Sequence, residues 1–297
     1  MESALGDTLL RIKHSDRDWH ERVFAFMESV FRAAGSNFKP WADRGGWRPG
    51  YEILAIERDG QILSTVGRQR MRLVVNGQGR DGYQLGGVAS RPDQRGRGLS
   101  RRVLTWVLSE ADAQNLPVIL FANKSVLDFY PRFGFRRVFQ KRFTAAGTIA
   151  PGVHPAPTID IEAATDRARV ETLCARAGIL GETFSARDYY PALLFHLIYR
   201  PRPVYWFDEC EAALIASVEG ERLVLHELLA ARPFDLAAAL PRLISHPVGE
   251  LEFRFSPEGW WPAAQALSAD EADSPLFVRG LPPLSSDVFR FPDLAQT

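Results

Sequence analysis

The chain has 297 residues, of which 46% are hydrophobic and 24% are charged, a balance typical of one or two folded soluble domains. Its 36 basic and 36 acidic residues cancel, which argues against a large basic surface for nucleic acid or an anionic membrane. We find no apolar run that could span a bilayer, no signal-peptide pattern, and no metal spacing around Cys174 and Cys210. We therefore expect a cytoplasmic protein with reduced thiols, no metal site, and no nucleic-acid or membrane partner.

The hydrophobic pattern of the first half alternates between helical and extended segments. The expected elements, in chain order, are a helix from Ser15 to Gly35, a long loop at 36–50, a hairpin at 51–75 that turns at Asp59-Gly60, a second turn at Asn76-Gly77, a strand at 83–90, a helix at 99–111, a strand at 117–122, a short helix through 125–133 and a strand at 135–143. Such an order predicts an α/β unit around a mostly antiparallel sheet with one βαβ segment in its middle.

A stretch rich in Gly, Pro and Ala interrupts this pattern at residues 145–158. We interpret it as a linker between a first domain at 1–147 and a second at 148–297. The second domain is expected to contain helices at 164–178 and 189–199, strands at 212–218 and 221–230 joined by a turn at Glu219-Gly220, a helix at 231–244 and a strand at 250–256.

The second half resembles a degraded copy of the first. In both halves an Arg-Pro pair follows a strand and precedes a helix, at Arg91-Pro92 and at Arg232-Pro233. A loop rich in glycine and arginine then follows only in the first half. Two unrelated α/β halves are the alternative interpretation, because the order strand, loop, helix, strand is common.

The segment RPDQRGRGLSRR, residues 91–102, has the composition of an anion pocket. Gly96 and Gly98 allow a tight turn that exposes successive backbone N–H groups at the positive end of a helix dipole. This arrangement suits a pyrophosphate. The surrounding arginines are Arg91, Arg95, Arg97, Arg101 and Arg102. A P-loop needs Lys-Ser/Thr after its last glycine and a Rossmann fingerprint needs a third glycine, and neither is present. A solvated basic turn is the alternative.

Further residues in the same order resemble the GNAT superfamily of N-acetyltransferases. They are a strand ending in VAS, the loop RGRGLS, Asn123 at the end of the next strand, and FYPRFGF at 129–135. The family's loop is written Q/R-x-x-G-x-G/A, and Arg95, Gly98 and Ser100 occupy its three defined positions, with Ser100 departing from Gly/Ala. The resemblance covers residues 8–145, and the doubled architecture resembles the first two domains of Eis-like acetyltransferases.

This resemblance implies an α/β GNAT fold, with a mixed, mostly antiparallel sheet flanked by helices, followed by a second, degenerate GNAT-like domain without its own CoA site. It also implies an enzyme that moves an acetyl group from acetyl-CoA to a primary amine by direct attack. The implied donor-binding residues are Val88, Ala89, Ser90, Arg95, Gly96, Arg97, Gly98, Leu99, Ser100, Arg101 and Asn123.

Each implied role has a chemical reason. Backbone groups of 88–90 would pair with the pantetheine amides like an added strand and would polarise the thioester carbonyl. The N–H groups of 96–101 would hold the pyrophosphate. Asn123 would hydrogen-bond the pantetheine arm or the acceptor. Tyr130 would protonate the leaving CoA thiolate, because a tyrosine keeps its proton at neutral pH. The alternative for Tyr130 is a core aromatic.

The general base is left open by the sequence. Strand 83–90 has no carboxylate, and alternation places Glu52 and Glu57 on opposite faces of the hairpin. Eis-like enzymes use a C-terminal carboxylate, so Thr297 is a candidate, as is a water relay or an amine with a lowered pKa. Trp41 and Trp47 are candidates for the acceptor pocket.

Two other functions fit the same segment. One is a non-catalytic acyl-CoA-binding or regulatory protein, and the other is an acyl or aminoacyl transferase with a carrier-bound donor. The expected acceptor is a small molecule, and a homo-oligomer is compatible with the sequence.

Overall fold

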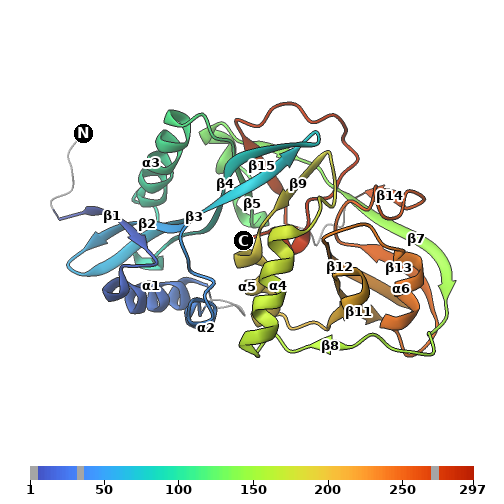
Figure 1. The fold of residues 1–297 in the computed structure, drawn as a ribbon. Coiled ribbons are helices and arrows are strands. Elements are labelled where there is room, and N and C mark those ends of the chain that lie inside the picture. The colour runs from blue at the N-terminus through green and yellow to red at the C-terminus, as the bar shows by residue number, and fades with distance from the viewer. Residues whose placement is uncertain (1–5, 32–36, 269–273) are drawn as a thin grey trace.

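Two mixed sheets form the framework of the protein (Figure 1). A computed structural model describes residues 6–31, 37–268 and 274–297. The first sheet has eight strands in the order β1-β2-β3-β4-β5-β15-β6, with β9 paired to β3. Its strands are β1 (Thr8–Lys13), β2 (Tyr51–Arg58), β3 (Gln61–Val75), β4 (Gln78–Ser90), β5 (Val118–Phe121), β6 (Arg136–Val138), β9 (Phe184–Arg187) and β15 (Leu276–Arg279).

The second sheet has seven strands in the order β14-β7-β13-β12-β11-β10-β8. Its strands are β7 (Lys141–Ile149), β8 (Thr158–Ile159), β10 (Val204–Phe207), β11 (Ala212–Glu219), β12 (Arg222–Ala230), β13 (Val248–Phe253) and β14 (Gln265–Ser268). Among the described strands, each sheet contains one parallel pair, β4 with β5 and β12 with β13, and the other pairs are antiparallel. The predicted fold class, mixed sheets flanked by helices, is confirmed.

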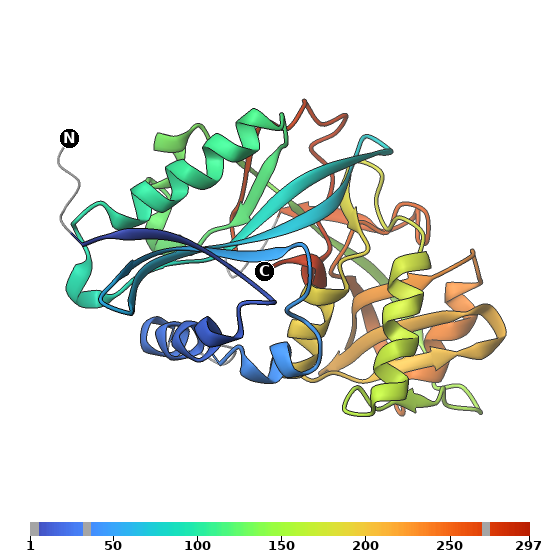
Figure 2. The same cartoon turned by 60° about the vertical axis from the view of Figure 1, so that its left-hand side comes forward.

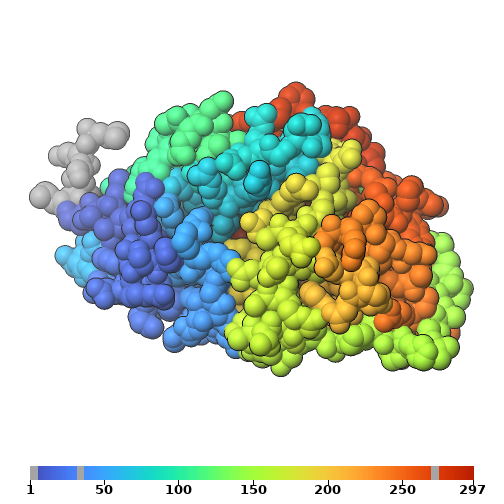
Figure 3. Space-filling view, viewed as in Figure 1, coloured from blue at the N-terminus to red at the C-terminus, as the bar shows by residue number. Residues whose placement is uncertain are grey.

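The helices lie on the outer faces of the sheets and between them. They are α1 (Arg17–Val30), α2 (Lys39–Asp43), α3 (Leu99–Ala113), α4 (Ala164–Arg176), α5 (Tyr190–Tyr199) and α6 (Leu236–Ala239). Figure 2 shows α3 on one face of the first sheet and α1 on the other. Residues of α1, α2, α4 and α5 share one hydrophobic core between the two sheets. In the space-filling view, blue residues of the first half meet yellow-green residues of the second half directly (Figure 3), and α2 also contacts α5.

The two hairpin turns of the first sheet follow from local chemistry. Asp59 and Gly60 have φ values of 50° and 77°, and Asn76 and Gly77 have φ values of 52° and 76°. Two successive left-handed residues give a turn whose twist matches that of the flanking strands, and Asp-Gly and Asn-Gly favour it. Both turns are where the sequence predicts them.

The two halves of the sequence exchange strands. The strands β9 and β15, from residues 184–187 and 276–279, join the first sheet, and β15 lies between β5 and β6. The strand β7 follows directly after β6 but pairs with β13 in the second sheet. The predicted linker at 145–158 is therefore wrong in its first five residues, which continue β7 to Ile149. The domain division at residue 147 stays a prediction.

Other expected elements differ in extent. The first helix begins at Arg17 after Asp16, without a side-chain cap, and its expected stop at Gly35 lies outside the described residues. The loop at 36–50 contains the short helix α2. The helix expected at 125–133 is two 3-10 turns, at Lys124–Val126 and Tyr130–Phe133. The helix expected at 231–244 is reduced to α6 and one 3-10 turn. No described helix is both long and apolar enough to cross a bilayer.

Candidate functional site

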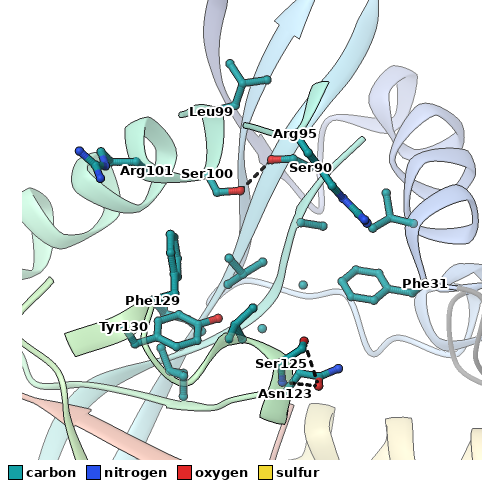
Figure 4. A pocket seen from close by; sticks show the side chains of 18 of the residues that line it. Phe31, Ser90, Arg95, Leu99, Ser100, Arg101, Asn123, Ser125, Phe129 and Tyr130 are labelled. Carbon is teal, nitrogen blue, oxygen red and sulfur yellow. Dashed lines mark hydrogen bonds between the residues drawn. The ribbon is translucent and has the colours of Figure 1, made fainter. Parts of the chain in front are cut away.

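A cavity of about 860 Å³ lies where β4, β5 and the N-terminus of α3 meet (Figure 4). Its lining includes Val88, Ala89, Ser90, Arg95, Gly96, Gly98, Leu99, Ser100, Arg101, Asn123 and Tyr130. The structure thus brings eleven of the twelve site residues proposed from the sequence around one space. The twelfth, Arg97, is exposed on the loop and is not among the lining residues.

The cavity begins where two parallel strands separate. The ladder between β4 and β5 covers only Tyr83 to Leu85 on β4, and β4 then continues to Ser90 paired with β3 alone. Its register on β3 shifts between Thr65 and Gly67, at the level of Gly87, which has φ +56°. A bulge of this kind turns backbone groups out of the ladder. The edge of β4 beyond Leu85 is therefore presented to the cavity.

The loop before α3 has the geometry of an anion site. Gly96 and Gly98 have φ values of +78° and +75°, and a Cβ at either position would meet no atom within 4 Å. Gly98 is the N-cap of α3, a 15-residue helix, and no side chain caps its first turn. The N–H groups at this end and the helix dipole together favour a negatively charged ligand.

The charges around the loop are unevenly paired. Arg91 contacts Asp93 at 3.1 Å and Arg102 contacts Asp7 at 2.5 Å. Among the described residues, no ion pair involves Arg95, Arg97 or Arg101, and Arg95 and Arg101 line the cavity. Two guanidinium groups are therefore available to phosphate oxygens at the mouth of the cavity.

Three serines join the end of β4 to the start of α3. The hydroxyl of Ser90 lies 2.7 Å from that of Ser100 and donates to that of Ser64 at 2.9 Å (Figure 4). Ser64 in turn donates to the carbonyl of Ala89 at 2.7 Å. This chain of hydrogen bonds gives a physical reason for a serine at position 100, because its hydroxyl fixes the helix against the strand.

Tyr130 places a phenol at the floor of the cavity. Its ring packs against Phe129, Phe135 and Phe277, with centroids 5.3–5.9 Å apart, and the residue is 6% exposed. Its hydroxyl points toward the cavity (Figure 4). Burial raises the pKa of Tyr130 to about 12, since the phenolate would lose its hydration. The phenol is therefore protonated at neutral pH, so it is both a packed aromatic and a proton donor.

Asn123 has a structural partner as well as a place in the lining. Its Oδ1 accepts hydrogen bonds from the backbone N–H of Ser125 at 3.2 Å and from the Ser125 hydroxyl at 3.3 Å. It thereby caps the turn that follows β5. Neighbouring lining residues that the sequence did not single out are Val30, Phe31, Gly86, Gly87, Gln94, Phe121, Val126 and Phe129. The double glycine within a strand is the signal that was available for a bulge and a close backbone approach.

The glutamates of the hairpin lie away from the cavity. Glu52 accepts from Arg68 at 2.6 Å and from Arg11 at 3.2 Å, and Arg68 also donates to Glu110 on α3 at 2.9 Å. Glu57 accepts from the backbone N–H of Gly60 in the turn. Neither glutamate is among the lining residues of the cavity.

Thr297 does reach the cavity. The backbone N–H of Thr297 donates to Gln84 Oε1 at 2.8 Å, and Gln84 Nε2 donates to the carbonyl of Ala295 at 2.8 Å. His196 Nε2 lies 2.9 Å from the carbonyl oxygen of Gln296, and burial lowers the pKa of His196 to about 4. The neutral imidazole and the buried glutamine therefore hold the last residues in one place, between β4 and α5.

A second, smaller cavity of about 50 Å³ adjoins the first and shares Gly86, Gly87 and Thr297 with it. Trp41 lines it, as the sequence suggested for an acceptor pocket. Trp47 is instead buried in the core, stacked on His20 with ring centroids 4.1 Å apart. The remaining lining residues are Phe38, Tyr51, Gln69, Pro191, Ala192 and Phe195.

Comparison with known proteins identifies a family model that part of the chain matches. Residues 11–138 match the family model described as an acetyltransferase (GNAT) domain. No curated protein sequence matches the chain.

Several solved structures share the fold of most of the chain. The crystal structure of Eis1 from Mycobacterium abscessus has a TM-score of 0.59 at 16% identity, over 92% of this chain and 73% of that chain. A GCN5-related N-acetyltransferase from Kribbella flavida gives 0.56 at 15% identity, over 93% and 72%. A probable N-acyltransferase from Enterococcus faecalis gives 0.58 at 14%, over 92% and 72%. The resemblance inferred from the sequence is confirmed by the family model over residues 11–138, and the fold of most of the chain is shared with these structures.

Proposed function

We propose that this protein is an N-acetyltransferase that moves the acetyl group of acetyl-CoA to a primary amine, because residues 11–138 match the model of a GNAT acetyltransferase domain. The proposal depends mainly on one observation, which is that an anion-binding loop and a free strand edge border the same cavity. The uncapped, glycine-rich start of α3 leads directly into a cavity lined by the free edge of β4. A ligand with a pyrophosphate at one end and an amide-bearing arm at the other matches both.

In this proposal the loop and the strand bind different parts of the donor. The N–H groups of residues 96–101, with Arg95 and Arg101, take the pyrophosphate. The pantetheine arm runs along Val88 to Ser90 as an added strand. The acetyl group then lies beyond Leu85, where the ladder between β4 and β5 has ended. Backbone N–H groups at this point would stabilise the oxyanion that develops on the thioester.

The chemical step needs one proton removed and one supplied. The amine nitrogen attacks the thioester carbon, and the resulting tetrahedral intermediate expels the CoA thiolate. Tyr130 gives its proton to that sulfur, and the attacking nitrogen loses one proton, so the products are an amide and CoA thiol. The pKa of about 12 keeps the tyrosine protonated until the thiolate forms.

The proton that the acceptor amine loses needs a base, and Thr297 in the C-terminal segment is a candidate. In a protein expressed with Thr297 as its last residue, the α-carboxylate of Thr297 lines the cavity beside Gly86. Two glycines appended after Thr297 should lower kcat at least tenfold. The loss should shrink as the pH approaches the pKa of the amine, because a free amine needs no base. pH–rate profiles of both proteins test this, and identical profiles would remove the tail from the chemistry.

The decisive experiment combines donor binding with turnover. Calorimetry measures the affinity for acetyl-CoA, and thiol release measures acetyl transfer to a panel of amines. We expect micromolar binding and amine-dependent thiol release. Tight binding without thiol release for any amine would favour a non-catalytic acyl-CoA-binding protein. Activity with a carrier-bound donor alone would favour the other alternative.

A further inference from the structure

The small cavity adjoins the larger one close to the place where the proposed reaction would occur. It meets the larger cavity at Gly86, Gly87 and Thr297. A Cβ on Gly86 would lie 3.1 Å from Thr297 Oγ1, so only a glycine leaves this junction open. The junction is also one residue beyond Leu85, where the acetyl group must lie in the proposed function. An amine that enters the small cavity therefore faces the thioester.

Four aromatic rings enclose this cavity, and both halves of the chain contribute them. The rings are those of Phe38, Trp41, Tyr51 and Phe195. Trp41 lies edge-on to Tyr51 at 5.2 Å, and Phe38 lies edge-on to Phe195 at 5.8 Å. Trp41 Nε1 donates to the carbonyl of Pro191 at 2.8 Å, which fixes the indole across the boundary between the halves. The enclosure is thus a rigid aromatic box rather than an open groove.

One residue that lines the box carries a buried polar atom without a partner. Gln69 Oε1 is buried and accepts no hydrogen bond within the described structure, while Gln69 Nε2 donates to the carbonyl of Arg70 at 2.8 Å. An unpaired buried carbonyl carries a free-energy cost, because it has lost its hydrogen bonds to water. A ligand N–H would remove that cost, so Gln69 marks where a donor group is recognised.

The box lacks the charges that a polycation needs. No Asp, Glu, Lys or Arg side chain is among its described lining residues. A second or third ammonium group would be taken from water without a carboxylate side chain to pair with, which is unfavourable. A single ammonium, in contrast, is attracted by the faces of aromatic rings before it loses its proton. The volume of the box also limits the size of the ligand. One water molecule needs about 10–15 Å³ of cavity volume, and the box offers about 50 Å³.

We propose that the acceptor is a small primary monoamine with a short apolar body, such as a branched alkylamine or a benzylamine. Its apolar carbons pack between Trp41, Tyr51 and Phe195, and its N–H donates to Gln69 Oε1. This inference rests on the proposed function and narrows its acceptor class. It disfavours aminoglycosides, polyamines and amino acids.

A substrate panel tests the class directly. Steady-state thiol release from acetyl-CoA is measured with isobutylamine, benzylamine, spermidine, kanamycin and glycine. We expect kcat/KM for the two monoamines to exceed the other three at least tenfold. A preference for spermidine or kanamycin would overturn the acceptor class and leave the proposed function standing. Failure of every amine, with acetyl-CoA still bound in calorimetry, would overturn both.

A matched pair of variants tests the role of Gln69. In Gln69→Leu, KM for isobutylamine should rise about tenfold, while the affinity for acetyl-CoA and the thermal midpoint stay the same or the midpoint rises, since a leucine leaves no unpaired carbonyl. Gln78→Leu makes the same change at an exposed position at the start of β4, and it should alter neither constant. An unchanged KM in Gln69→Leu would contradict the proposal.

Discussion

The two parallel strand pairs of the molecule, β4 with β5 and β12 with β13, have the same construction but opposite outcomes. In each pair the ladder stops after three or four residues, at Leu85 and at Leu225. Each pair is crossed by a helix that returns the chain to the sheet, α3 in the first and α6 in the second. The first strand of each pair, β4 or β12, also has a register shift against its antiparallel neighbour, β3 or β11, just beyond that point. Beyond the shift, the first pair encloses the cavity and the second is filled.

The helix ends show one cause of the difference. The helix α3 starts at Gly98, which has no side chain to cap it, whereas α6 starts at Asp235, whose carboxylate accepts from the N–H of Ala238 at 3.1 Å. A carboxylate at a helix N-terminus occupies the position that a phosphate would take. The helix α6 is also only four residues long, against 15 for α3, so its dipole is weaker.

The chain itself fills the second pair. Beyond β13, the backbone carbonyl of Arg254 accepts a hydrogen bond from the N–H of Asp293 at 3.0 Å, and the N–H of Ser256 donates to the backbone carbonyl of Arg290 at 3.1 Å. Glu227, next to the register shift on β12, is completely buried. The same terminal segment then reaches Gln84 and the first cavity. One framework therefore encloses a cavity in the first half and anchors the tail in the second.

The largest effect on donor binding should come from a bulky side chain in the glycine loop before α3. Gly98→Trp fills the open space at the start of α3 and should abolish acetyl-CoA binding in calorimetry. Gly220→Trp is the matched control, because Gly220 has φ +64°, open surroundings and a turn position in the second sheet. Both variants carry the backbone strain of about 1–2 kcal/mol of a left-handed non-glycine residue. Binding retained by Gly98→Trp would show that the pyrophosphate lies elsewhere.

Removal of one hydroxyl should have the next largest effect. Tyr130→Phe should lower kcat about 100-fold, as expected when a general acid is lost, with unchanged affinity for acetyl-CoA. Tyr205→Phe is its counterpart in the second half, where the hydroxyl donates to the carbonyl of Leu243 at 3.0 Å. That change should leave kcat unaffected. Equal rates for Tyr130→Phe and the unaltered protein would assign Tyr130 to packing alone.

The strand pair β12 and β13 should make the stability of the protein depend on pH, through the buried Glu227. Burial raises the pKa of Glu227 to about 8 from an ordinary value of 4.5, so the folded state holds a proton that the unfolded state releases. Stability is therefore lost as the pH rises from about 5 to 8, by at most about 1.4 kcal/mol per pH unit. Denaturant melts of Glu227→Gln should show a flatter dependence over this range. Glu219→Gln, at an exposed position on β11, should keep the original slope.

The smallest effect should come from removing the side-chain cap of α6. Asp235→Ala removes the carboxylate that caps the start of α6 and should lower the free energy of unfolding by about 1 kcal/mol. Titration of this variant with acetyl-CoA should still give one site per chain, because the tail segment fills the second pair. A stoichiometry of two would mean that the aspartate alone keeps the second site closed.

The lining of the large cavity, which is the proposed donor side, could be predicted closely because most of its residues are nearly continuous in the sequence. Residues 88–101 form one strand, one loop and one helix start, and local rules govern each of them. The exception is Arg97, whose neighbours on both sides line the cavity while it does not. The strands β9 and β15 were missed, since FSAR and LFVR are four-residue runs whose pattern says little without the sheet that they join.

The sequence by itself determined the conformations that depend on near neighbours. These are the two left-handed hairpin turns, the glycine loop with its uncapped helix, and the placement of Tyr130 after β5. Only the tertiary structure decided the acceptor side, because Trp41, Gln69, Phe195 and Thr297 come from segments far apart in the chain. It also decided which strand pair stays open, since both parallel ladders stop after three or four residues and the difference lies in what the rest of the chain places beyond them.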